Sequence, residues 1–193
     1  MFLLYAIVIG FGLGFLLGGR PAGLATLNFR WAPVALLGLA IQILLFSGPI
    51  SDRVGALGPV IYVGSTAMVL VVVLRNIRIT GMALVAIGAV SNLLAIVANG
   101  GYMPTSPEAA AAAGHVEATT YSNSAILESG EVVLAPLTDI FAMPEWMPFS
   151  NVFSIGDVLI GLGVAVVIVV AMRRGAPSAG GASRNLPQPR TPA

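Results

Sequence analysis

The stretch SIGDVLIGLGVAVVIVVAM, residues 154–172, says most about the fold of this chain. Its one charged residue, Asp157, lies near its start, and the segment after Asp157 is an unbroken run of apolar and small residues. A helix needs about 20 mostly apolar residues, within a range of roughly 17–25, to cross the hydrocarbon core of a bilayer. The stretch therefore predicts a transmembrane helix.

Four more segments approach the same length and composition, which predicts an all-α, polytopic integral membrane protein. The membrane domain is expected to occupy residues 1–172, and one long loop is expected at 99–153. A tail over 173–193 is rich in Pro, Gly, Ser and Arg, has no apolar period, and is predicted to be disordered. The five predicted transmembrane helices are about 1–18, 31–47, 57–74, 79–98 and 154–172.

The overall composition agrees with a bilayer and excludes several kinds of site. Charged residues make up 9% of the chain, against about 25% in soluble domains. A net charge of +1 gives no reason to expect a nucleic-acid partner. The chain has no cysteine and only His115 as histidine, and it lacks phosphate-loop, dinucleotide and nucleophile-elbow motifs. We therefore predict no metal, no cofactor and no catalytic residue, and favour a non-enzymatic protein.

The arginines predict the orientation of the helices. With five spans, eight of the basic residues fall on one side and only Arg53 falls on the other. Because cytoplasmic loops carry an excess of Lys and Arg, the N-terminus is expected outside and the C-terminus in the cytoplasm. The predicted location is the inner (plasma) membrane, and the long loop is then extracytoplasmic. The eight residues are Arg20, Arg30, Arg75, Arg78, Arg173, Arg174, Arg184 and Arg190.

Polar residues within the predicted helices share one depth. Gln42, Asn92, Asn99 and Asp157 all fall within roughly 0–13 Å of the outer helix ends, at 1.5 Å per residue. Polar groups inside a membrane are costly and are the first candidates for function. We expect a polar, outward-facing recess that the acidic loop covers. For Asn92, a hydrogen bond that joins two helices is the competing interpretation.

Two short motifs border the loop. The first is NGGYMP, residues 99–104, in which Asn99 and two glycines suit a helix C-cap and Tyr102 suits an interface anchor or a ligand contact. The second is FSIGD, residues 153–157. Here Ser154 and Asp157 have the spacing of a capping box, with Asp in place of Glu. The alternative for Asp157 is a carboxylate that coordinates a ligand or handles a proton.

The first predicted helix carries glycines at four-residue spacing: Gly10, Gly14 and Gly18. Small residues at this spacing let another helix approach closely in lipid. The partner could be the last helix, with Gly156 and Gly163, or another copy of the chain.

The two motifs, together with LTD at residues 137–139 and VFSIGDVLIGLG at 152–163, resemble a family of uncharacterised bacterial membrane proteins with a domain of unknown function. The resemblance covers about residues 1–172. It implies a five-helix membrane protein of the cell envelope, and it implies no activity, cofactor or catalytic residue. Its signature positions would be Asn99, Gly100, Gly101, Met103, Pro104, Asp139, Ser154, Gly156 and Asp157.

Three functions remain open from the sequence. The first is binding of a small molecule, lipid or partner through the recess. The second is an accessory subunit or scaffold of a membrane complex, and beyond the lipid bilayer a homo-oligomer or such a complex would supply the partner. The third is an enzyme on a lipid-linked or envelope substrate, with Asp157 and Asp139 or a loop Glu as acid and base. The candidate ligand-binding residues are Gln42, Asn92, Asn99, Tyr102, Asp139 and Asp157.

Overall fold

The computed structural model of the chain describes residues 2–114, 124–126 and 132–174. The part that it describes is mostly helical, and its long helices agree with the predicted segments to within a few residues. Outside the described residues lie the single histidine, His115, three acidic residues of the loop, Glu117, Glu128 and Glu131, and the part of the predicted disordered tail from residue 175 onward. The long helices are α1 (Phe2–Leu16), α2 (Ala32–Leu45), α4 (Gly58–Arg75), α5 (Met82–Ala98) and α7 (Ile155–Arg174).

The long loop adds β-structure, which the all-α prediction did not include. β1 (Met103–Thr105) pairs in parallel with β2 (Ser124–Ile126), and β3 (Phe141–Ala142) pairs antiparallel with β4 (Val152–Phe153). Strands of two or three residues are too short for an alternating pattern to be read from a sequence. The remaining short elements are η1 (Pro21–Thr26), α3 (Gly48–Val54), η2 (Gly55–Leu57), α6 (Pro107–Ala112) and η3 (Ala135–Leu137).

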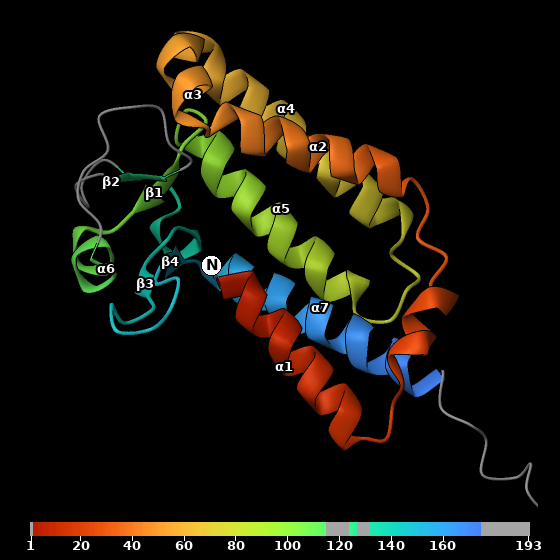
Figure 1. Cartoon of the computed structure of the whole chain (residues 1–193). Coiled ribbons are helices and arrows are strands. Elements are labelled where there is room, and N and C mark those ends of the chain that lie inside the picture. The colour runs from red at the N-terminus through yellow and green to blue at the C-terminus, as the bar shows by residue number, and fades with distance from the viewer. Residues whose placement is uncertain (1, 115–123, 127–131, 175–193) are drawn as a thin grey trace, which may run out of the picture.

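The long helices form a row in which each packs on its neighbours in the order α1, α7, α5, α4, α2 (Figure 1). The last helix in sequence, α7, therefore lies between the first helix and α5. The strands and α6 lie together across one end of the helix axes, beside the N-terminus of α1 (Figure 1). The loop thus covers the helix end at which α7 begins.

Glycines let α7 approach both of its neighbours. A Cβ atom on Gly163 would lie 2.8 Å from the carbonyl oxygen of Gly81, the residue that precedes α5. On the opposite side, a Cβ atom on Gly10 would lie 3.0 Å from the Cα atom of Ala165. The close partner of the α1 glycines is thus α7 of the same chain. Gly18 does not take part, because it has a φ of +75° after the end of α1 and a Cβ atom there would meet nothing within 4 Å.

The outer faces of the helices are apolar. Leu16, Ile43 and Val60 are each more than two-thirds exposed, at 83%, 72% and 69%. Two segments, Gly55–Arg75 and Ile155–Arg174, are long and apolar enough to cross a bilayer, and α1, α2 and α5 are shorter apolar helices. Large exposed apolar surfaces mark sites of contact with lipid or protein. These features point weakly to a membrane protein.

Candidate functional site

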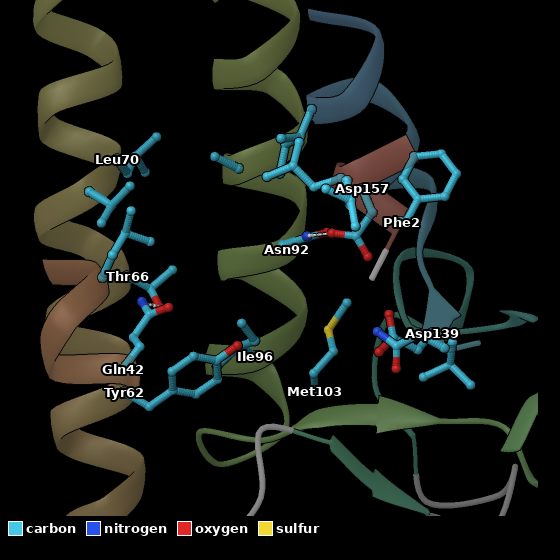
Figure 2. A pocket seen from close by; sticks show the side chains of 18 of the residues that line it. Phe2, Gln42, Tyr62, Thr66, Leu70, Asn92, Ile96, Met103, Asp139 and Asp157 are labelled. Atoms are coloured by element: carbon cyan, nitrogen blue, oxygen red, sulfur yellow. Dashed lines mark hydrogen bonds between the residues drawn. The ribbon is translucent and has the colours of Figure 1, made fainter. Parts of the chain in front are cut away.

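A cavity of about 530 Å³ lies among the long helices at their loop-covered end. Its volume is within the range of roughly 300–1,000 Å³ that is usual for ligand pockets. Residues from α1, α2, α4, α5 and α7, and from the loop, line it. Four of the six predicted site residues are among them, namely Gln42, Asn92, Asp139 and Asp157 (Figure 2).

The walls of the cavity are more apolar than the sequence had led us to expect. Most lining side chains are aliphatic or aromatic. Asn151 is a polar lining residue, and five further polar side chains form two groups. Asn92, Asp139 and Asp157 lie on one side, whereas Gln42 and Thr66 lie on the other (Figure 2). An apolar cavity with a few converging polar groups is the usual form of a small-molecule site.

Asp157 forms the capping box that the sequence indicated. Its Oδ2 atom accepts a hydrogen bond from the backbone N–H of Ser154 at 3.0 Å. In return, the backbone N–H of Asp157 donates to the Ser154 hydroxyl, also at 3.0 Å. These two bonds satisfy donors that the first turn of α7 would otherwise leave unpaired. Asp157 is therefore a helix cap, and it lines the cavity as well.

Asn92 joins α5 to this cap through two hydrogen bonds. Its Nδ2 atom donates to Asp157 Oδ1 at 2.8 Å, and its Oδ1 atom accepts from the Ser154 hydroxyl at 2.8 Å. The interpretation of Asn92 as a bond between helices is confirmed by this geometry. A Cβ atom on Gly156 would overlap the Asn92 amide, so the glycine of the FSIGD motif makes room for the bridge.

The surroundings of Asp139 differ from those of Asp157. It lies between η3 and β3 and is held through its backbone, whose N–H donates to the Pro104 carbonyl at 2.9 Å and whose carbonyl accepts from Ser106 N–H at 3.1 Å. The side chain is only 6% exposed, and its Oδ1 atom has no hydrogen-bond partner within the described part of the chain. Burial, and secondarily the charge of Asp157, raises the pKa of Asp139 from 3.8 to about 7.

On the far side of the cavity, Gln42 of α2 donates through Nε2 to the Thr66 hydroxyl of α4 at 3.2 Å. The bond joins the two outermost helices of that side of the row. The buried ring of Tyr62 lines the cavity next to it (Figure 2). Gln42 and Thr66 carry no charge, and Asp139 and Asp157 are the only acidic or basic residues among the described residues that line the cavity.

The remaining two candidates, Asn99 and Tyr102, are not among the residues that line the cavity. Asn99 follows α5 and donates through Nδ2 to the carbonyls of Ala95 at 2.7 Å and Val133 at 2.8 Å. Its Oδ1 atom accepts from Val133 N–H at 2.9 Å, so Asn99 fastens the returning loop to the end of α5. Gly101, with a φ of +92°, packs closely on Pro59. The NGGYMP motif thus forms the turn after α5 and holds the returning loop against the end of that helix.

Sequence reasoning did not name the other lining residues as site residues, among them the apolar Phe2 and Met103 and the polar Asn151. Phe2 and Met103 are apolar, and nothing in their local pattern separates them from other core positions. Asn151 stands three residues before Ser154, next to the FSIGD motif, and its position was the one available signal.

A family model whose description is "Family of unknown function (DUF5317)" matches residues 26–169. This range includes α2 to α5 and most of α7 but not α1, so the match is narrower than the resemblance expected from residue 1. No curated protein and no solved structure matches the chain. The match covers well over half of the chain and agrees with the expected uncharacterised family. The chain therefore belongs to the DUF5317 family of unknown function.

Proposed function

We propose that the chain is an integral protein of the plasma membrane with five transmembrane helices, an outer N-terminus and a cytoplasmic C-terminus. The apolar outer faces of the long helices support this arrangement. So does the grouping of the arginines. Arg20 N–H donates to the Met172 carbonyl at 2.9 Å, and Asn76 bonds the backbone N–H and carbonyl of Arg30, each at 2.8 Å. The arginine-bearing ends of α1, α2, α4 and α7 therefore lie at the same end of the helix axes.

Within this arrangement, the cavity faces the outer side and binds a small molecule. One observation carries the proposal: a ligand-sized cavity collects Gln42, Asn92, Asp139 and Asp157 from separate segments, and the Oδ1 atom of the buried Asp139 has no partner among the described residues. A buried polar atom without a partner is costly, and proteins keep few of them. A ligand that donates to Asp139 would remove that cost.

An enzymatic function has less support, although Asp139 and Asp157 line the same cavity. An acid–base pair needs two carboxyls that are free to exchange protons with a substrate. Both oxygens of Asp157 already accept hydrogen bonds, from Asn92 and from Ser154. Binding is therefore the function that we propose.

Native mass spectrometry of the protein released from mild detergent tests this function. We expect a discrete adduct on the wild-type chain and its loss in Ala89→Leu, which adds volume at a residue that lines the cavity. Glu145→Gln, on the exposed part of the loop, is the control and should keep the adduct. A bare wild-type protein, or an adduct of equal intensity in all three proteins, would contradict binding in the cavity.

A further inference from the structure

We propose that the ligand of the cavity is an amphipathic amine, whose ammonium group binds Asp139 and whose apolar chain lies along α1 and α2. This inference rests on the proposed function, because it names the chemical class that the same cavity takes. It follows from three features: the charge of the lining, the unpartnered carboxyl oxygen and the position of the apolar wall.

The lining is negatively charged and lacks a compensating cation. Asp139 and Asp157 both contribute to it, and no arginine, lysine or histidine does so among the described residues. Asp157 accepts hydrogen bonds at both oxygens, but Asp139 Oδ1 has no partner in the described chain. A buried acceptor needs a donor, and an ammonium group brings both N–H donors and positive charge.

A metal ion fits this cavity less well. Calcium takes 6–8 oxygen ligands, and magnesium requires nearly octahedral coordination. The described residues contain no group of three or more acidic, histidine or cysteine side chains that could hold a metal ion. A cavity of about 530 Å³ with mainly apolar walls instead suits an organic cation.

The apolar wall shows where the rest of the ligand would lie. Leu3 and Leu4 of α1 and Leu39 of α2 line the cavity and are 44%, 40% and 46% exposed. Each of these side chains therefore contacts the cavity and also reaches the outer surface of its helix. In the proposed arrangement, this surface meets the acyl chains of the outer leaflet, so a ligand with an apolar chain could enter from the membrane.

A proton competes with the amine for Asp139. The titratable groups that line the cavity with Asp139 are Asp157 from α7 and Tyr62 from α4. The described lining from α1, α2, α5, β1 and β4 carries no ionisable side chain. Since the pKa of Asp139 is about 7 in the empty cavity, the apparent affinity for a cation should fall about tenfold between pH 8 and pH 6.

The experiment uses the full chain in nanodiscs of zwitterionic lipid and three probes: decylamine, decanol and butylamine. The apparent dissociation constant is taken from the rise of the thermal unfolding midpoint with probe concentration. The proteins are the wild type, Asp139→Asn, Ala89→Leu and the control Glu145→Gln. We expect decylamine to bind, with about tenfold weaker binding at pH 6 than at pH 8 and a loss of about tenfold or more in Asp139→Asn.

The probes separate the failure of this inference from that of the proposed function. If decanol binds as tightly as decylamine in both wild type and Asp139→Asn, and Ala89→Leu abolishes binding, the cavity is a site but not one for amines. If butylamine binds as tightly as decylamine, the ligand is a soluble amine and the amphipathic assignment is wrong. If no probe binds, this inference is overturned, while the adduct measured without probes still decides the proposed function.

Discussion

At the scale of single residues, the cavity contains two aspartates in opposite situations. Asp157 lies at the start of α7, where both of its oxygens accept hydrogen bonds. Asp139 lies in the loop, is buried, and has an Oδ1 atom without a hydrogen-bond partner in the part of the chain that the structure describes. The capping role of Asp157 could be predicted from the Ser154 to Asp157 spacing alone. The burial of Asp139 could not, because it depends on how a loop without a periodic pattern folds back onto the helices.

The raised pKa of Asp139 predicts a pH dependence of stability. A carboxyl whose pKa is higher in the folded state stabilises the fold at low pH, and this contribution is lost as the pH rises through about 7. The shift from 3.8 to about 7 corresponds to about 4 kcal/mol over its full range. We expect the thermal unfolding midpoint of the wild type to fall from pH 5 to pH 8, and to fall much less in Asp139→Asn.

Glu145→Gln serves as the control for this pH profile, because it removes one negative charge from an exposed position of the loop. It should keep the wild-type slope. An unchanged slope in Asp139→Asn would mean that Asp139 is solvated or paired.

At the scale of elements, the five helices follow from the apolar segments, and one contact face could also be predicted. Gly81, Gly88 and Asn92 share a helical stripe in the sequence, and the structure places this stripe against α7. The identity of the neighbour did not follow, because a period specifies which residues share a face but not which helix packs on it. The short strands of the loop could not be predicted from the sequence either.

The glycine contacts between α5 and α7 predict a contrast between two substitutions. Gly163→Ala would place a Cβ atom 2.8 Å from the Gly81 carbonyl oxygen and 2.8 Å from Val85 N, so the two helices must separate. Gly64→Ala in α4 meets nothing within 4 Å, and alanine is favoured over glycine in a helix by about 1 kcal/mol. The thermal unfolding midpoint should fall clearly in Gly163→Ala and stay level or rise in Gly64→Ala. Equal effects would contradict the close packing of α5 on α7.

At the scale of the whole molecule, the row of helices has an arginine-rich end and a loop-covered end, and the cavity lies at the latter. The sequence predicted the arginine asymmetry, and it predicted that Gln42, Asn92 and Asp157 share a depth. It also named Asp139 as a candidate, but it could not predict how deeply Asp139 is buried beside them, because that depends on the fold of the loop between α5 and α7. It also gave no sign of the apolar wall from α1, since that wall depends on which helices are neighbours.

The proposed orientation can be tested because the chain contains no cysteine. Ala56→Cys, before α4, and Thr80→Cys, before α5, place single thiols at exposed positions on opposite ends of the row. A membrane-impermeant thiol reagent added to spheroplasts should label Cys at 56 and leave Cys at 80 unlabelled until the membrane is opened. The reverse pattern would invert the topology, and labelling of both would contradict a membrane-spanning α4.

The central claim is that Asp139 is a carboxyl buried in the cavity whose Oδ1 atom has no hydrogen-bond partner among the described residues, and its own titration tests this most directly. The chain contains three aspartates, Asp52, Asp139 and Asp157, so protein labelled with ¹³C at the aspartate carboxyl carbon gives three NMR signals. Asp139→Asn identifies the signal of Asp139 by its disappearance. We predict that this signal titrates with a midpoint at about 7 in the ligand-free protein. A midpoint near the ordinary value of 3.8 would contradict the claim, and with it the basis for a binding site at Asp139.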